Sequence, residues 1–272
     1  SVLAEAASDD GMGVLDRDGF EPALLALVRP WLSGAAVPVL ACGMVGSRQG
    51  WAEAPYAAVP AKPLELQAVA VAGTDPAIAV RIVPGLKQVD PPEVMRGEET
   101  QIAGFLSGAP DFEGVVCLPG THTKWVQVSA GEVVSFRTAM TGELFDLLSH
   151  HSVLRHSVDG EGMRDDAFLD AVGDALSRPE ALAQRLFGIR AAHLLQGTEA
   201  AVGRSRLSGL LIGAELAALR PYWLGQDLAL VGAAEQCGVY AKALETQGLS
   251  PAIHDGAEAI EALKGCEYDA IV

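Results

Sequence analysis

The sequence predicts an α/β protein, and two observations support this fold class. First, short apolar runs that end at glycine or proline alternate with stretches whose apolar residues have helical spacing. Second, three β-rich runs follow one another at 115–118, 125–128 and 133–136, and the turn residues between them indicate a three-strand meander. Further strands are expected at 38–42, 79–83 and 228–231, and around Ile253.

Helices are expected between these strands. One is predicted at 20–32, and a second begins near Glu98 and continues to Leu106. Thr141 is expected to be the N-cap of a helix at 144–153, and 155–203 is expected to be helical but more polar. The last helices are expected at 235–247 and from about 256 onward. A strongly apolar helix at 205–222 contains small residues that permit close packing, namely Gly209, Gly213, Ala214 and Ala217.

The composition argues against several classes of protein. Half of the 272 residues are hydrophobic, so the chain can bury a sizeable core and is not disordered. The net charge of −16 argues against binding to nucleic acid backbones or to anionic membrane surfaces. The start of the chain lacks the basic segment and long apolar core of a signal peptide. The four cysteines, Cys42, Cys117, Cys237 and Cys266, lie far apart and form no C-x-x-C pair. Cys42 and Cys117 lie in apolar, strand-like runs, which indicates buried free thiols and fits a reducing cytoplasm.

The turn after the first strand of the meander contains residues suited to a phosphate. Gly120 lets a ligand approach the backbone closely, and Thr121 and Thr123 supply hydroxyl groups. Backbone N–H groups in such a turn can also point at an anion. The alternative is an ordinary polar β-turn, which the spacing alone does not exclude.

Two further places have the residues of a ligand site. The strand at 38–42 runs into a glycine-rich loop, and open α/β sheets bind ligands at such loops, although a plain connection is the alternative. Glu98 and Glu99 lie in the first turn of a predicted helix. Carboxylates there stabilise the helix through its dipole, and the functional alternative is that one of them accepts a proton from a substrate hydroxyl.

Five separated motifs occur in the order found in one family. They are ACGMVGSRQGWAEAPY (41–56), VMRGEETQIAG (94–104), LPGTHTKWVQV (118–128), RTAMTGEL (137–144) and SGLLIGAEL (208–216). Together they resemble the 2-dehydro-3-deoxygalactonokinase family of bacterial sugar-acid kinases, over most of the chain. The resemblance implies a two-domain, actin-like ATPase (ribonuclease H-like) sugar kinase fold. It also implies ATP- and Mg²⁺-dependent phosphorylation of the 6-hydroxyl of 2-dehydro-3-deoxy-D-galactonate, in galactonate catabolism.

The resemblance implies roles for particular residues. Gly120, Thr121 and Thr123 match a phosphate hairpin, and Glu98 matches the acidic base, although most relatives with this fold have Asp there. An adenosine-binding turn is expected at Gly232, Ala233 and Ala234. The substrate side is expected to include Gly43, Met44, Val45, Gly46, Ser47 and Trp51.

The domain organisation follows from the same resemblance. A first α/β domain on the substrate side is expected at 1–114, and a second on the nucleotide side at 115–272, with a helical insertion at about 155–203. The family begins with a hairpin of Asp-x-Gly-x-Thr type followed by an arginine, and residues 1–20 do not match it. The first domain is therefore expected to lack its leading hairpin in this chain.

Other functions and partners stay open at this point. A non-catalytic sugar-acid sensor on the same fold is the main alternative, and a metal hydrolase using His122, His150 and His151 is a weaker one. No metal ligand is assigned. The P-loop pattern GxxxxGK[ST] is absent from the sequence, which disfavours a P-loop enzyme. The expected partners are a sugar acid and ATP, with a homodimer as a further option, and the sequence fits both epimers of the sugar acid.

Overall fold

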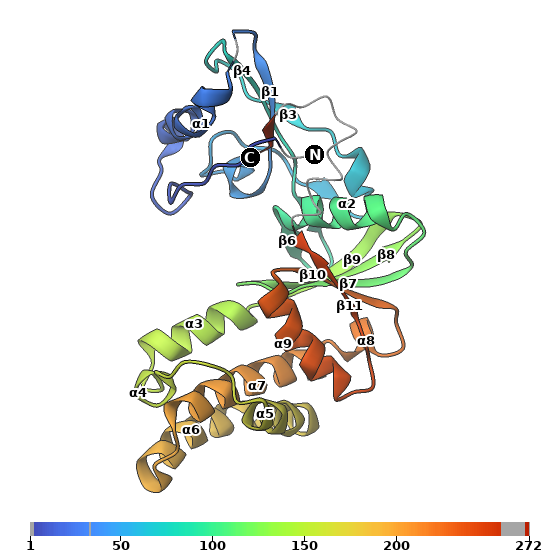
Figure 1. Cartoon of the computed structure of the whole chain (residues 1–272). Coiled ribbons are helices and arrows are strands. Elements are labelled where there is room, and N and C mark those ends of the chain that lie inside the picture. Colours follow the sequence, from blue (N-terminus) through green and yellow to red (C-terminus); the bar gives the residue numbers. More distant parts are fainter. Residues whose placement is uncertain (1–2, 33, 257–269, 272) are drawn as a thin grey trace. The chain divides into compact units, whose positions relative to one another are not determined.

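The chain has a mixed α/β architecture, which confirms the predicted fold class at this level (Figure 1). This computed structural model describes residues 3–32, 34–256 and 270–271. The chain forms two compact units. The first contains 3–112, 129–135 and the terminal strand, and the second contains 113–128 and 136–255. The division into two domains at residue 114 stays a prediction, and each unit is described by itself.

The first unit contains two small sheets. In one, with strand order β12-β1-β4-β3, β1 (Val37–Ala41) pairs in parallel with β4 (Ile78–Ile82) and with β12 (Ala270–Ile271). The other has the order β2-β5-β6. The remaining elements are η1 (Arg17–Gly19), α1 (Phe20–Val28), η2 (Arg29–Trp31), η3 (Gly43–Gly46), β2 (Ala57–Ala58), η4 (Pro63–Glu65), β3 (Val69–Ala70), β5 (Leu86–Gln88), β6 (Glu93–Met95) and α2 (Glu98–Gly108).

The core of the first unit lies between α1 and the larger sheet. Strand β4 alternates buried and exposed residues, so it turns one apolar face inward. Helix α1 buries its own apolar stripe in the same cluster, because its apolar residues recur at helical spacing. The cluster includes Leu24, Leu25, Val28, Val39, Ala41, Ile78, Val80 and Ile82.

The second unit is built on a five-stranded sheet of order β11-β10-β7-β8-β9, although residues 132–135 of β9 belong to the first unit. Strand β7 (Gly114–Leu118) is antiparallel to β8 (Thr123–Ser129) and parallel to β10 (Leu228–Gly232), which is parallel to β11 (Ala252–Asp255). The predicted meander 115–136 is therefore confirmed as consecutive strands in one sheet. The other elements are β9 (Glu132–Ala139), α3 (Thr141–His151), α4 (Arg155–Val158), α5 (Asp165–Ser177), η5 (Pro179–Ala181), α6 (Leu182–Gln196), α7 (Ala200–Ala218), α8 (Arg220–Trp223) and α9 (Ala234–Glu245).

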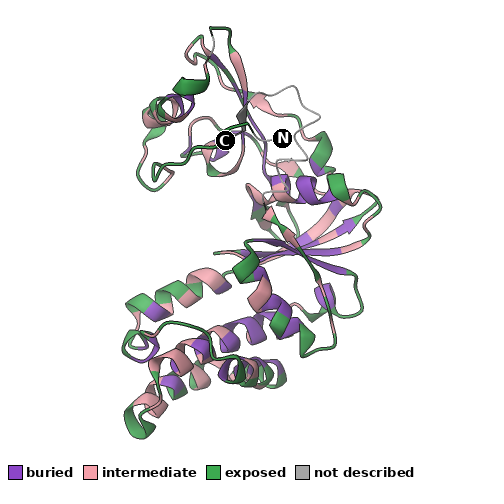
Figure 2. Cartoon of the chain, in the orientation of Figure 1, coloured by how far each residue is buried: buried purple, intermediate pink, exposed green. Residues whose placement is uncertain are grey.

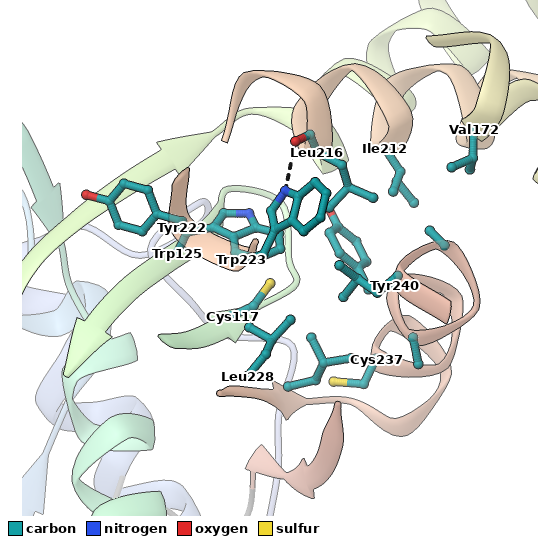
Figure 3. Close-up of a cluster of buried hydrophobic side chains, with 14 of the residues drawn as sticks. Cys117, Trp125, Val172, Ile212, Leu216, Tyr222, Trp223, Leu228, Cys237 and Tyr240 are labelled. Carbon is teal, nitrogen blue, oxygen red and sulfur yellow. Dashed lines mark hydrogen bonds between the residues drawn. The ribbon is translucent and has the colours of Figure 1, made fainter. Parts of the chain in front are cut away.

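Helices cover one face of this sheet, and its central strands are buried along most of their length (Figure 2). The main cluster joins Cys117 and Trp125 of the sheet to Phe168 of α5, Leu216 of α7 and Tyr240 of α9. Figure 3 shows Cys117, Trp125, Leu216 and Tyr240 in this cluster. The indole N–H of the neighbouring Trp223 donates to the carbonyl of Leu216 at 2.8 Å. Trp125 and Leu216 are fully buried, so this cluster determines how the helices lie on the sheet.

Glycines on α7 allow α5 to pack very closely against it. A Cβ atom on Gly209 would overlap the carbonyl oxygen of Phe168, and one on Gly213 would lie 2.6 Å from that of Val172. The prediction that the small residues of this helix permit close packing is confirmed.

Several local predictions were wrong or incomplete. Helix α3 begins at Thr141, its N-cap is Met140, and the Thr141 side chain bonds Glu215 instead of capping the helix. The strands β2, β3, β5 and β6 were missed because two or three residues are too few to show alternation. The helix predicted from about 256 onward, together with Cys266, lies outside the described residues apart from Gly256. None of the described helices is both long and apolar enough to cross a membrane.

Candidate functional site

The structure brings two of the predicted ligand turns together in the second unit. Because β7 and β10 are parallel neighbours, their carboxyl ends lie at the same edge of the sheet. The β7–β8 turn contains Gly120, and the β10–α9 turn contains Gly232. A Cβ atom on Gly232, whose φ is +151°, would lie 3.6 Å from the carbonyl oxygen of Pro119. The turns predicted to hold phosphate and adenosine are therefore adjacent.

The β7–β8 turn leaves open space beside its glycine. A Cβ atom on Gly120 would meet no atom within 4 Å among the described residues, and Thr121 is exposed. Thr123 differs, because its side chain is 0% exposed and its hydroxyl lies 2.9 Å from that of Tyr240. The hydroxyl of Thr121 can reach a ligand, whereas that of Thr123 faces the core.

The first turn of α3 packs directly on this turn. The backbone N–H of Glu143 donates to the carbonyl of Thr121 at 2.9 Å, and His122 Nε2 lies 2.6 Å from Glu143 Oε2. A Cβ atom on Gly142 would overlap the carbonyl oxygen of Gly120, so only glycine allows this approach. A helix N-terminus favours a nearby anion. In the sequence this segment is part of the motif at 137–144, which carries no functional pattern of its own.

A buried carboxylate connects the elements around the turn. Glu215 of α7, which is 5% exposed, accepts hydrogen bonds from Trp125 Nε1 at 2.7 Å, from the hydroxyl of Tyr240 at 2.9 Å, and from that of Thr141. Burial raises the pKa of Glu215, and these three hydrogen bonds oppose that rise. Since Tyr240 donates its proton to Glu215, the Thr123 hydroxyl donates to Tyr240. The network joins β8, α3, α7 and α9.

A pocket of about 620 Å³ adjoins the β10–α9 turn. Glu235, which follows the predicted adenosine turn, lines it together with Phe145 of α3 and Arg204 of α7. The Arg204 guanidinium lies 4.8 Å from the centre of the Phe145 ring, a cation–π arrangement. Residues 159–163 form another wall. The volume and the aromatic and polar lining suit a small organic ligand.

The first unit places the acidic helix start beside the glycine-rich loop. Strand β1 ends at Ala41 and the loop forms η3. Gly97, the N-cap of α2, has a φ of +110°, and a Cβ atom there would lie 3.3 Å from the Cα of Gly43. Gly43 itself has a φ of +84°. Glycine at both positions therefore lets the two segments approach, and Glu98 lies next to the loop.

Glu98 and Glu99 have different surroundings. Glu99 is 0% exposed, and its two carboxylate oxygens accept the N–H of Gly97 at 2.8 and 3.0 Å and, at one oxygen, the hydroxyl of Thr100. Burial, with a smaller contribution from the charge of Glu98, raises the pKa of Glu99 to about 7, although the backbone hydrogen bonds oppose this rise. Glu98 is partly exposed and accepts the N–H of Arg96 at 2.9 Å. Only Glu98 retains an accessible carboxylate.

The other residues predicted on the substrate side divide into accessible and packed ones. Met44 is 50% exposed, whereas Ser47 is only 7% exposed. Val45 and Trp51 pack, partly buried, against the core of the first unit. Gly46 is also buried.

Arg96 is a residue that sequence reasoning missed. Its guanidinium donates to the carbonyl of Ala54 at 2.8 Å and lies 4.2 Å from the centre of the Tyr56 ring. Its Nε and Nη1 atoms are buried without a hydrogen-bond partner in the described part of the chain. A Cβ atom on Gly46 would lie 2.7 Å from Nη1, so this cation lies directly behind the glycine loop. The sequence signal that could have indicated this residue is its place directly before Gly-Glu-Glu in the motif at 94–104.

The histidines do not assemble into a metal site in the described residues. His122 pairs with Glu143, and His150 Nδ1 lies 2.9 Å from Asp146 Oδ1. Residues 3–32, 34–256 and 270–271 contain no group of three or more His, Cys, Asp or Glu side chains that could hold a metal ion.

Comparison with known proteins identifies the family. The model of the family described as 2-keto-3-deoxy-galactonokinase matches residues 1–264. A Rhizobium meliloti (strain 1021) protein named "Probable 2-dehydro-3-deoxygalactonokinase" is 41% identical over 268 residues, which cover 96% of this chain and 88% of that protein. The 2-dehydro-3-deoxygalactonokinase of Escherichia coli (strain K12) is 37% identical over 254 residues, which cover 92% of this chain and 85% of that protein.

A solved structure agrees with these matches. It is described as "Crystal structure of a putative 2-dehydro-3-deoxygalactonokinase protein from Sinorhizobium meliloti". It aligns with a TM-score of 0.91 at 40% identity, covering 98% of this chain and 91% of that one. The mixed α/β fold is therefore that of a kinase family. The chain belongs to the 2-keto-3-deoxy-galactonokinase family.

Proposed function

We propose that the protein transfers a phosphoryl group from ATP to the 6-hydroxyl of 2-dehydro-3-deoxy-D-galactonate, in galactonate catabolism. Family membership supports the reaction class, because both relatives are named for this kinase activity. The structural observation that carries the proposal is the adjacency of the two turns at the ends of β7 and β10. Phosphoryl transfer depends mainly on positioning and charge stabilisation, and this edge has groups for both.

ATP is proposed to bind in the second unit. Its phosphates would lie at Gly120 and Thr121, where the backbone is open and the N-terminus of α3 favours negative charge. Its adenosine would lie at Gly232, Ala233 and Ala234, with the pocket beside Glu235 receiving the base. Thr123 would anchor the turn through Tyr240 instead of contacting the phosphates.

The sugar acid is proposed to bind in the first unit. Its contacts would be the loop Gly43–Gly46, which includes Met44 and Val45, together with Ser47 and Trp51. Arg96 places a positive charge behind this loop, which favours a carboxylate-bearing substrate. We also propose that the two units correspond to the two domains of an actin-like fold.

Glu98 is proposed as the base. It would accept the proton of the 6-hydroxyl while the oxygen of that hydroxyl attacks the γ-phosphorus and ADP leaves. Glu98 is partly exposed, with one carboxylate oxygen accepting the N–H of Arg96, whereas Glu99 is fully buried. Glu99 is proposed to fix the start of α2, so that Glu98 faces the loop.

Magnesium is expected from the kinase class, but the described residues do not form a metal site by themselves. Mg²⁺ commonly enters such sites with the nucleotide, holding water and phosphate oxygens and only one or two protein carboxylates. No step is assigned to it here.

A coupled ADP-release assay across 2-keto-3-deoxy sugar acids tests the proposed function. The expected result is the highest kcat/KM with the galactonate-derived acid, and a lower value with its gluconate-derived epimer. ADP release with neither acid, combined with binding of the acid in a calorimeter, would replace the kinase with the sugar-acid sensor.

A further inference from the structure

A groove between α6 and α7 is lined by three arginines in a chain whose net charge is −16. Its volume is about 670 Å³. Arg178, Arg185 and Arg206 contribute the charge, Gln184, Gln196 and Thr198 contribute neutral polar groups, and none of its lining residues is acidic. A local concentration of positive charge is notable in so acidic a protein, because local fields govern which small ions bind.

The neighbouring carboxylates neutralise these arginines only in part. Asp174 Oδ2 lies 2.6 Å from Arg185 Nη1 and 3.2 Å from Arg206 Nη2, so one carboxylate oxygen serves two guanidinium groups. Arg178 Nε lies 3.7 Å from Glu180 Oε1, and both of these side chains are largely exposed. The Nε of Arg185 is buried and has no hydrogen-bond partner among the described residues. Each guanidinium has five N–H donors, so donors remain for a further anion.

The middle of the groove is open because α6 has a glycine there. Gly188 lines the groove, and a Cβ atom on it would meet nothing within 4 Å in the described structure. The walls come from η5, α6 and α7, and they share no residue with the pocket beside Glu235. The groove is therefore separate from the proposed adenosine pocket.

We propose that this groove is a second ligand site, which binds a small organic anion carrying phosphate or carboxylate groups. The planar fork of arginine matches the oxygens of both groups, and several guanidiniums around one cavity favour a ligand with more than one negative charge. The volume lies in the range of small-molecule sites. This proposal does not depend on the proposed kinase reaction.

Calorimetric titration with inorganic phosphate and, separately, with citrate tests this proposal. The intact chain is first saturated with a non-hydrolysable ATP analogue and Mg²⁺, which removes binding at the β7–β8 turn. At least one probe is expected to bind, and the tighter one identifies phosphate or carboxylate as the preferred group. Arg185→Gln and Arg178→Gln are each expected to raise the Kd about tenfold, the loss typical of one charge-assisted hydrogen bond.

Two further variants separate a site from a general effect of charge. Arg155→Gln removes the same charge from an exposed position on α4, outside the groove, and is expected to change the Kd less than twofold. Gly188→Leu fills the groove without a change of charge and is expected to abolish binding, while circular dichroism and kinase activity stay as in the parent. The proposal would be overturned if neither probe bound, or if the parent and all variants had the same Kd. It would also be overturned if Arg155→Gln weakened binding as much as the groove variants do.

Discussion

Glu98 and Glu99 adjoin in the sequence, but the fold gives their carboxylates different surroundings. Glu99 turns back onto the N–H of its own N-cap and is enclosed, whereas Glu98 keeps an accessible side chain beside the glycine loop. A proton acceptor has to reach the substrate hydroxyl, so geometry favours Glu98 even though burial raises the pKa of Glu99 to about 7. Raised pKa values also occur in structural carboxylates, and Glu99 fits that description.

The variant Glu98→Gln is expected to lower kcat by about 10²–10⁴-fold, since a positioned proton acceptor contributes roughly that factor. The KM for ATP should be nearly unchanged, because the nucleotide is proposed to bind in the second unit. Steady-state kinetics of Glu98→Gln beside Glu99→Gln measure both quantities. A larger loss of kcat in Glu99→Gln would move the assignment to that residue.

Glu99 is also expected to make stability depend on pH. Its pKa in the folded protein, about 7, lies above the ordinary value of 4.5, so folding favours the protonated form. That contribution is complete below about pH 4.5 and is lost as the pH rises through about 7. The free energy of unfolding should therefore fall between pH 5 and pH 8, relative to Glu99→Gln, by on the order of 3 kcal/mol. Urea unfolding of the parent protein and of Glu99→Gln across this pH range measures the effect. If the free energies of unfolding of the two proteins change with pH in parallel, Glu99 does not cause the dependence.

At the scale of an element, the β7–β8 turn has open space beside Gly120, and it packs against the first turn of α3 on its other side. Gly120→Val should fold normally, because a Cβ atom there meets no protein atom within 4 Å. Its branched side chain would occupy the space proposed for the phosphates, so kcat/KM for ATP should fall at least about 100-fold while Tm changes little. Kinase assays and thermal unfolding of Gly120→Val test this prediction. Gly120→Ala, which adds only a methyl group, is the matched variant with the smaller side chain. Full activity in the valine variant would remove the turn from the site.

The α5–α7 contact is expected to be intolerant of a single added methyl group. In Gly209→Ala the new Cβ atom would overlap the carbonyl oxygen of Phe168, and a backbone atom cannot rotate away. Overpacking of this kind costs about 1–3 kcal/mol. Gly173→Ala on the facing helix meets no atom within 4 Å and should gain up to about 1 kcal/mol from helix propensity. Urea unfolding of the two variants should therefore give shifts of opposite sign, and equal shifts would contradict the packing argument.

At the scale of the whole molecule, each unit is proposed to bind a different substrate, and hydrogen exchange can follow both at once. A non-hydrolysable ATP analogue should slow amide exchange at 118–122 and 232–236 in the second unit. The sugar acid should slow exchange at 43–47 and 96–99 in the first unit. Exchange falls where a ligand protects amides or restricts local opening. If the nucleotide protected only the first unit, the proposed roles of the two units would be reversed.

The sequence by itself determined the order of most helices and strands, including the meander, and it predicted two ligand turns that both lie in the second unit. Local signals are sufficient for these features, because apolar periodicity and turn residues act within a few positions. The five motifs also indicated the family that the comparisons show. Gly120 and Gly232 can each be predicted to lie in a ligand turn from the sequence, but the adjacency of the two turns depends on the pairing of β7 with β10.

Only the tertiary structure decided which side chains around these turns are accessible. Thr121 and Thr123 look equivalent in the sequence, but Thr123 bonds Tyr240, which lies 117 positions away. Likewise Glu215 receives its hydrogen bond from Trp125 across 90 positions, and the three arginines of the α6–α7 groove meet only because the helices pack together. Such contacts depend on long-range packing and burial, which no local pattern of residues records.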